Sequence, residues 1–292
     1  MSLPAHQDSA LAHTPYAGRH RPFTIGVVRL ARDDWFEFDA HRDAELALKA
    51  QIFDTADDAF LATDTSLAAQ EEAAATIADW LKARGQPVAS PDEPPLQAIS
   101  RLVQDDLVLM EHDGTAWCLT AASLCFPSSW SLSDKFGRGL DGLHHNVPGW
   151  QDKMGRQVSR LFDTMRPGAL VWRLNWSLQQ GPSYRMPKLE TDQRPSWTGT
   201  DGAHVRVERQ TLTKLPRTGA ILFTIKIQLD PFEAFAAHPD GAALAGALAD
   251  ELEALTPDQR AYKGLVSVGA ELVAKLRGLQ SSVATDNVRP EK

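Results

Sequence analysis

Three segments in the second half of the chain alternate between two kinds of side chain, as the residues of a β-strand do. They are residues 169–178, 204–212 and 220–229. Because a strand has a period of two, Arg173 and Asn175 share one face of the first segment, whereas tryptophan and leucine occupy the other. A short turn containing Pro and Gly joins the last two segments, which is typical of a hairpin. The alternation therefore predicts an antiparallel meander.

The rest of the chain favours helices on both sides of these strands. Apolar residues recur at helical spacing in residues 43–53, 66–84, 151–165, 241–255 and 265–276. Gly278 is placed to end the last of these helices. A second hairpin is predicted over residues 106–120, where an Asp-Gly pair separates two β-prone segments, and a short strand is predicted within residues 23–30. The predicted fold class is α+β, an antiparallel sheet with flanking helices.

These elements are expected to form one domain over residues 23–278. Residues 1–22 are polar and lack the continuous apolar core of a secretory signal, so we interpret them as a disordered leader. Residues 279–292 are interpreted as a disordered tail. Residues 87–95 contain four prolines, but a stretch of this length is an ordinary long loop and does not require a domain boundary.

Composition excludes several classes of protein. A formal net charge of -8 and a pI near 5.6 argue against a nucleic-acid partner, because binding phosphates requires clustered Lys and Arg. The two cysteines, Cys118 and Cys125, are too few for a disulfide framework, which favours a reducing compartment. No stretch reaches the roughly 18 apolar residues that a membrane span needs. We therefore expect a cytoplasmic protein without a membrane partner.

The long loop before residue 151 carries two adjacent histidines, His144 and His145. Common catalytic patterns are absent, including GxGxxG, GxxxxGK[ST], HExxH and GxSxG. A neutral imidazole in such a loop is able to ligate a haem iron. The alternative is a pair of partly exposed loop histidines, because a single His is a weak metal signal.

Polar side chains on the predicted strands are the other candidates for chemistry. Arg173 is able to donate a hydrogen bond to a bound ligand, and Glu208 is able to hold an ammonium group. Asn175 and Arg209 lie on the same two strands as these residues. The alternative is a solvated sheet face, or an ordinary ion pair between Arg173 and Glu208.

Four segments together resemble a known family. They read CFPSSWSLSDKFGRGLDGLHHNVPGW, VWRLNWSL, VRVERQTLTKLPRTGAILFTIKIQL and AYKGL, in that order along the chain. Their order and spacing resemble the haem-dependent oxidative N-demethylase alpha-subunit-like proteins, and the resemblance extends over about residues 23–278. It implies a PAS-like fold in which helices and a five-stranded antiparallel sheet enclose a pocket for haem b.

The resemblance also implies an activity and a set of partners. The reaction is oxidation of a small secondary amine such as dimethylamine by dioxygen, which gives formaldehyde and the demethylated amine. Electrons are expected to come from NADPH through partner subunits that carry FMN and a [2Fe-2S] cluster. A further partner that binds tetrahydrofolate is expected to take up the formaldehyde.

Individual residues take their roles from the same resemblance. His144 matches the family's loop histidine and is the expected metal ligand, the axial ligand of the haem iron. The family's following Pro-Val-Pro reads Asn146-Val147-Pro148 here, so His145 stays a competing ligand. Arg173 lies where PAS haem sensors carry a distal arginine. Glu208 is the hypothetical anchor of the amine, with Asn175 or Arg209 as supporting polar groups.

Two other functions stay open at this point. A haem-based gas or redox sensor would keep the pocket without catalytic turnover. A binding module would keep the fold without haem. Genes for a reductase next to this one would favour the enzyme over both.

Overall fold

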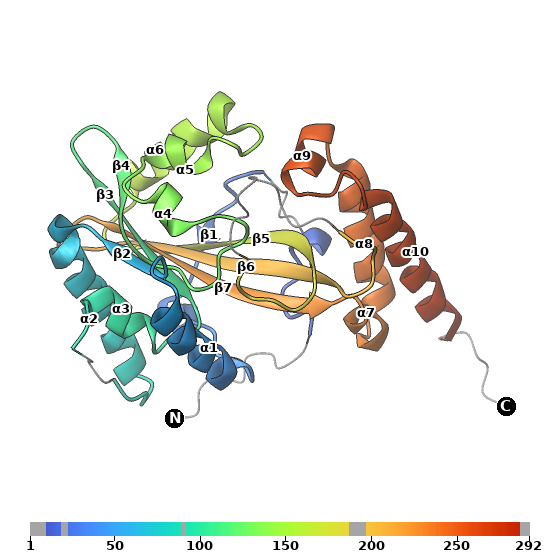
Figure 1. Cartoon of the computed structure of the whole chain (residues 1–292), viewed down its shortest axis with the longest axis horizontal. Helices are drawn as coiled ribbons and strands as arrows, with labels where there is room; N and C mark the ends of the chain where they lie inside the picture. The colour runs from blue at the N-terminus through green and yellow to red at the C-terminus, as the bar shows by residue number, and fades with distance from the viewer. Residues whose placement is uncertain (1–9, 19–22, 89–91, 187–196, 287–292) are drawn as a thin grey trace.

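A seven-stranded antiparallel sheet runs through the centre of the protein (Figure 1). The computed structural model describes residues 10–18, 23–88, 92–186 and 197–286. The strand order is β1-β5-β6-β7-β3-β4-β2. The five central strands are β3 (Asp106–His112), β4 (Trp117–Ser123), β5 (Leu170–Gln180), β6 (Ala203–Lys214) and β7 (Ile221–Pro231). The two short edge strands are β1 (Val28–Arg29) and β2 (Phe60–Ala62). The predicted α+β class, the meander and the second hairpin are thus confirmed.

The sheet has seven strands where five were expected, because two short segments pair with its outer edges. β1 pairs with β5 over only two residues, and β2 pairs with β4 over three. The strand expected within residues 23–30 is therefore much shorter than the prediction. Short edge strands leave few unpaired backbone groups for a second chain to bind, which limits edge-to-edge association.

The register between β5 and β6 decides which side chains meet. Asn175 lies opposite Glu208, and Arg173 lies opposite Gln210. These four residues share one face, which we call the α6 face because α6 packs over it. Arg209 follows Glu208 and therefore belongs to the opposite face, which we call the α8 face.

The helices follow the predicted segments with shifted ends. Before the meander they are α1 (Arg42–Thr55), α2 (Leu67–Lys82), α3 (Pro95–Ser100), α4 (Leu132–Lys135), α5 (Leu140–His144) and α6 (Gly155–Thr164). After it they are α7 (Ala234–Ala237), α8 (Gly241–Ala254), α9 (Pro257–Tyr262) and α10 (Gly269–Asp286). Short 3-10 turns lie at Pro15–Ala17, Arg32–Asp34 and Asp64–Ser66, and a π-helical turn lies at Trp150–Met154. None of the helices in the described ranges is long and apolar enough to cross a membrane.

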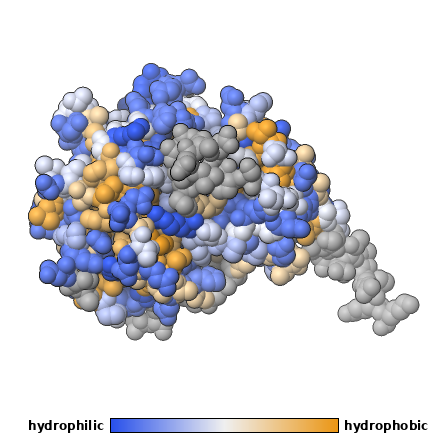
Figure 2. Space-filling view, in the orientation of Figure 1, coloured by the Kyte–Doolittle hydropathy of each residue, from blue (hydrophilic) through white to orange (hydrophobic). Residues whose placement is uncertain are grey.

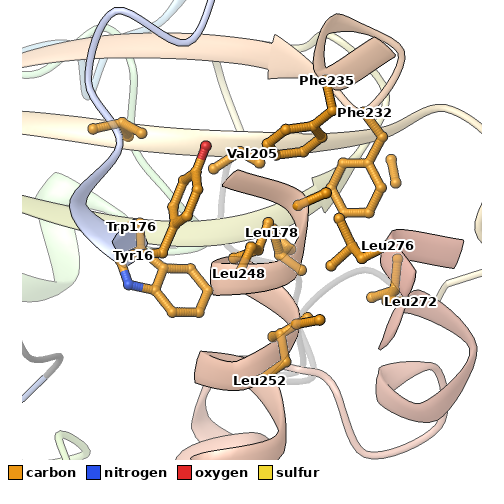
Figure 3. Packing of buried hydrophobic residues seen from close by; sticks show 14 of the residues in the cluster. Tyr16, Trp176, Leu178, Val205, Phe232, Phe235, Leu248, Leu252, Leu272 and Leu276 are labelled. Atoms are coloured by element: carbon orange, nitrogen blue, oxygen red, sulfur yellow. The ribbon is translucent and has the colours of Figure 1, made fainter. Parts of the chain in front are cut away.

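Two apolar clusters cover the α8 face. One joins Trp176 and Leu178 of β5 to Leu248 of α8 and Leu272 of α10, and Tyr16 packs against it (Figure 3). The other joins α2 and α3 to the β3 and β7 side chains that point to the same face. Full burial of each large side chain contributes roughly 1.5–3 kcal/mol, so the two clusters anchor the helices firmly to the sheet.

The α6 face carries a third cluster at one end of the strands. Val108 and Met110 of β3 and Leu212 of β6 pack there against Leu140 of α5 and Phe162 of α6. Seen from outside, apolar residues in the view of Figure 2 form small patches separated by hydrophilic ones. Among the described residues, the large apolar side chains that are exposed are Val28, Leu67 and Val266. Scattered surface positions of this kind are ordinary.

Both chain ends differ from the expected disorder where they are described. Leu11 and Tyr16 lie within the expected leader, but they are buried in the cluster of α8 and α10. Their apolar surface explains the order, because a purely polar leader would have nothing to bury. At the other end, Gly278 does not terminate a helix, and α10 continues to Asp286. Residues 1–9, 19–22 and 287–292 of the expected leader and tail lie outside the described ranges.

Candidate functional site

The segment that carries the histidines is tied to the sheet at its start. The Asp106 carboxylate accepts hydrogen bonds from the backbone N–H groups of Cys125 (2.8 Å) and Phe126 (2.9 Å). Arg206, fully buried on β6, donates to the backbone carbonyl of Phe126 at 2.7 Å. Burial raises the pKa of the Cys125 thiol to about 12, so this cysteine is not a thiolate near neutral pH. Its environment is that of a packed structural residue.

His144 lies at the end of α5, in a segment predicted as loop. Lys135 holds this end of the helix by donating to the backbone carbonyls of Leu143 (2.8 Å) and Gly142 (3.3 Å). The Nδ1 atom of His144 is 2.9 Å from the backbone oxygen of Leu140. Because a carbonyl oxygen only accepts hydrogen bonds, Nδ1 carries the proton. A neutral His144 ring then has its lone pair on Nε2.

The surroundings of His144 favour this neutral form. Burial lowers the pKa of the imidazole, and the nearby positive charges of Lys135 and Arg173 lower it further, against the raising effects of the Leu140 hydrogen bond and the Asp141 charge. Within the part of the chain that the structure describes, no side chain forms a hydrogen bond with Nε2. Metal-bound histidines usually donate their other ring nitrogen to such a carbonyl, so His144 has the form that an axial ligand needs.

The ring of His144 stacks on the indole of Trp150, with ring centroids 4.1 Å apart and planes inclined by 15°. The Trp150 Nε1–H group donates to the Asp141 carboxylate at 2.8 Å. On the other side, a Cβ atom at Gly155 would lie only 3.0 Å from Trp150 Nε1. A side chain at residue 155 would therefore force the indole or the backbone of α6 to shift by a few tenths of an ångström.

His145 differs from His144 in its exposure. Its Nδ1 atom is 3.1 Å from the carbonyl oxygen of Gly142, but the residue is exposed to solvent, and no ring in the described residues stacks on it. The two histidines thus share one kind of backbone contact, but only His144 is half-buried and stacked on another ring.

Four polar side chains form a row on the α6 face of β5 and β6. Asn175 and Gln210 both donate to Glu208 Oε2, at 3.2 Å and 2.8 Å. Glu208 Oε1 receives no hydrogen bond from the described residues. Two amide donors therefore fix one oxygen of this carboxylate and leave the other for a ligand.

Arg173 lies in the same row, half-buried on β5. Burial lowers the pKa of its guanidinium, and the charge of Glu208 opposes this change. Within the described residues, no hydrogen bond or ion pair involves Arg173. A partly desolvated guanidinium with five unused N–H groups is well suited to bind an anionic or polar ligand.

Apolar side chains next to this row are only partly covered. Val171 and Phe223 on the sheet, Leu143 in α5 and Val147 just after it are half-buried members of the third apolar cluster. An apolar surface with a few fixed polar groups is the usual lining of a cofactor site. Together with His144 Nε2 and Arg173, which have no hydrogen-bond partner among the described residues, this lining has the chemistry that a haem site would need.

The structure does not bring Arg209 to this row. Arg209 is 1% exposed on the α8 face, where its Nε atom is 2.7 Å from Glu37 Oε1. It also donates to the backbone oxygens of Trp35 (2.8 Å) and Asp34 (2.6 Å). The supporting role expected for Arg209 beside Glu208 is therefore incompatible with its position, and Gln210 occupies that place instead.

Sequence reasoning missed Gln210, Trp150 and Asp141. Gln210 had a signal, because it follows Glu208 by two residues on one strand and must share its face. Trp150 and Asp141 had none, because their contact depends on the π-helical turn at Trp150–Met154. Such turns occur often at functional sites.

The described residues contain no group of three or more His, Cys, Asp or Glu side chains that could hold a metal ion. A haem iron is held mainly by its macrocycle and requires only an axial side chain. The family model described as "Haem-dependent oxidative N-demethylase, alpha subunit-like" matches residues 82–273, which is more than half of the chain and includes α5, the π-helical turn and the meander. The chain therefore belongs to the haem-dependent oxidative N-demethylase alpha-subunit-like family.

Proposed function

We propose that the chain is the haem-binding subunit of an oxidative N-demethylase that acts on a small secondary amine such as dimethylamine. The observation that carries the proposal is the contact of His144 Nδ1 with the Leu140 carbonyl, which places the ring proton on Nδ1 and leaves Nε2, near Arg173, without a hydrogen-bond partner among the described residues. Family membership supports the same reading. In this proposal one methyl group leaves as formaldehyde and the amine gains a hydrogen. Two electrons from the substrate and two electrons with two protons from the donor side reduce one dioxygen, so that one oxygen atom leaves in formaldehyde and the other in water.

His144 is the residue that would hold a haem iron, through Nε2. Its hydrogen bond to Leu140 increases the basicity of the ring and fixes which nitrogen is free. A bound haem would supply the activation of dioxygen, as cofactors do for chemistry that side chains cannot perform. Arg173 would donate hydrogen bonds to the negative charge that develops during dioxygen reduction.

Glu208 is the proposed anchor for the amine. A secondary ammonium group would donate to Glu208 Oε1, while Asn175 and Gln210 hold Oε2 in place. The same carboxylate is able to take a proton from the ammonium, which would release the neutral amine for oxidation. Half-buried apolar neighbours such as Phe223 would accept the methyl groups.

The donor side of the proposal requires other subunits. Electrons would pass from NADPH through partners that carry FMN and a [2Fe-2S] cluster, and a tetrahydrofolate-binding partner would capture the formaldehyde. The alpha-subunit description of the family supports a multi-subunit enzyme.

The test is an absorption spectrum of the protein expressed with ample haem supply. Spectra are recorded in the ferric form, after dithionite, and after addition of dimethylamine. We expect a stoichiometric Soret band that shifts on reduction and shifts again with the amine. The Glu208→Gln variant should keep the first shift and lose most of the second, because it lacks the charge that binds the ammonium.

Other outcomes separate the competing functions. A Soret band that never responds to any small amine would favour a haem sensor over the enzyme. No Soret absorbance, even after reconstitution with hemin, would overturn every haem function and leave a binding module.

A further inference from the structure

Two residues near His144 have no role in the proposed chemistry. One contacts the imidazole, and the other contacts the first. Trp150 stacks on the ring of His144 at 4.1 Å. Asp141 accepts the indole N–H of Trp150 at 2.8 Å. Both contacts connect α5, which carries Asp141 and His144, with the π-helical turn that begins at Trp150.

The orientation of the imidazole depends on more than its own helix. The hydrogen bond from Nδ1 to Leu140 fixes one edge of the ring, but a single contact leaves the ring able to rotate about its side-chain bonds. The indole of Trp150 fixes the plane of the ring, because a near-parallel stack at this distance permits little tilt.

Three neighbouring residues determine the position of the indole. Asp141 binds its N–H group, and Gly155 allows the backbone of α6 to approach its ring closely. Gly149, just before Trp150, has φ +79°, a left-handed conformation that favours glycine at the entry to the π-helical turn. Trp150 itself is 2% exposed, so the indole ring is shielded from solvent.

We propose that Trp150 and Asp141 are positioning residues that hold the His144 imidazole in one plane and one tautomer, with Nε2 left free for coordination. This inference rests on the proposed function, because Nε2 needs to stay free only if it coordinates a haem iron. Asp141 acts through Trp150, and Trp150 acts through His144. Neither residue is expected to touch substrate.

The chain offers a matched control for Asp141. Asp163 accepts the indole N–H of Trp117 at 2.8 Å, and both aspartates are exposed. Trp117 packs edge-on against Phe162 and His112 and makes no ring contact with His144. Asp163→Ala therefore removes the same kind of hydrogen bond from the same apolar cluster without touching the proposed chain of contacts.

The first measurement uses the full-length protein without haem, labelled with ¹⁵N-histidine. Long-range ¹H–¹⁵N correlation spectra report which ring nitrogen carries the proton, and the His144→Gln spectrum identifies the signal. Wild type, Asp141→Asn and Asp163→Ala should show a single Nδ1–H tautomer. Asp141→Ala and Trp150→Ala should show a mixture of tautomers. A single Nδ1–H tautomer in Asp141→Ala, with Trp150→Ala either the same or unfolded, would overturn the proposal.

The second measurement is the rate of haem transfer to excess apomyoglobin. Loss of a partner that orients a metal ligand typically weakens binding 10- to 100-fold, so we expect Asp141→Ala to release haem about 10-fold faster than wild type. Asp163→Ala and Asp141→Asn should match wild type. Equal rates for both alanine variants would count against positioning. Failure of the wild type to take up haem would overturn the proposed function, whereas the NMR comparison would still decide the role of Asp141.

Discussion

Arg209 Nε lies 2.7 Å from Glu37 Oε1 on the α8 face. The neighbouring residue on β6, Glu208, points to the opposite face, toward the candidate site. Glu37 also contacts His13 at 2.7 Å. The charges of Arg209 and His13, with the hydrogen bond from His13, lower the pKa of Glu37 against the raising effect of burial. This arrangement connects the segment around Glu37 to the middle of the sheet and indicates a structural role for Arg209.

The first prediction concerns this ion pair. Arg209→Met should reduce the free energy of unfolding by about 3–5 kcal/mol, because it removes the buried cation beside Glu37 and leaves two backbone oxygens without their donor. Urea unfolding of Arg209→Met, Glu37→Gln and the double variant measures the coupling between the two residues. We expect a coupling of about 1–3 kcal/mol.

The control for this cycle is the ion pair of Arg84 with the exposed Asp33, whose charged atoms are 2.8 Å apart. Because the Asp33 side chain is 94% exposed, Asp33→Asn should cost less than about 1 kcal/mol. The folded fraction of Arg209→Met should bind haem as wild type does. A variant that is stable but free of haem would instead place Arg209 in the site.

The position of Arg209 also shows what the sequence does and does not determine. Strict alternation predicted the three meander strands and the face of Asn175 and Glu208, because the period of a strand is fixed by its geometry. The same alternation put Arg209 on the other face, so a role beside Glu208 conflicted with the pattern itself. A buried arginine was not foreseeable, since its partner Glu37 comes from a segment 172 positions earlier without a helical or strand signal.

The candidate site, too, could be predicted only in part from the sequence. The family motif identified the segment of His144, but the short helix α5, the Leu140 hydrogen bond and the Trp150 stack depend on contacts that local patterns do not encode. The disorder predicted for the chain ends was not found in their described residues, for another reason. Composition made the leader look disordered, although Leu11 and Tyr16 contribute enough apolar surface to join the core.

The second prediction separates the two histidines. His144→Ala should abolish or greatly weaken haem retention, because it removes the enclosed imidazole with the free Nε2. His145→Ala should retain haem, because the exposed ring of His145 makes no stacking contact with a described residue. The measurement is the ratio of Soret to protein absorbance after gel filtration. The reverse pattern would move the axial ligand to His145.

The third prediction concerns Arg173. Arg173→Leu should keep haem bound, because His144 is unchanged, but the reduced protein should reoxidise faster in air. The reason is that the guanidinium would no longer donate hydrogen bonds to ligands on this face. Stopped-flow absorbance measures the rate, and a tenfold increase would correspond to about 1.4 kcal/mol. Arg185→Leu is a suitable control, because Arg185 is committed to Asp58 at 2.9 Å. An unchanged rate in Arg173→Leu would make Arg173 a structural residue.

The fourth prediction is a pH dependence of stability that arises at Asp105. Burial raises the pKa of this fully buried carboxyl group to about 6, although Arg209 and Lys226 lower it. In the unfolded chain the pKa is about 3.9, so the folded state binds the proton more tightly. The stabilisation of the folded state by the protonated Asp105 carboxyl is therefore complete below about pH 4 and is lost as the pH rises through about 6.

Asp105→Asn tests this assignment. Relative to wild type, the variant should gain about 2 kcal/mol of unfolding free energy between pH 4.5 and pH 7.5, since it no longer carries a buried charge. Urea unfolding at several pH values gives the difference. Asp92→Asn, at an exposed position, should show a flat difference over the same range. A flat difference for Asp105→Asn as well would mean that the carboxyl stays ionised in both states.

The fifth prediction concerns the turn between α7 and α8. A Cβ atom at Gly241 would lie 1.6 Å from the backbone oxygen of Phe235 and 2.7 Å from its carbonyl carbon. Because these are backbone atoms next to a fully buried phenylalanine, they cannot move aside without shifting α7. Gly241→Ala should therefore cost about 3 kcal/mol or more.

Gly278→Ala is the matched substitution in α10. Gly278 is exposed within the helix, and no atom lies within 4 Å of its added Cβ. Alanine at an exposed helix interior should stabilise the protein by about 0.5–1 kcal/mol, because glycine loses more backbone freedom on folding. Thermal unfolding followed by circular dichroism should thus move in opposite directions for the two variants. A loss of stability in Gly278→Ala would show that α10 ends at this residue, and a tolerated Gly241→Ala would show that the turn before α8 adapts.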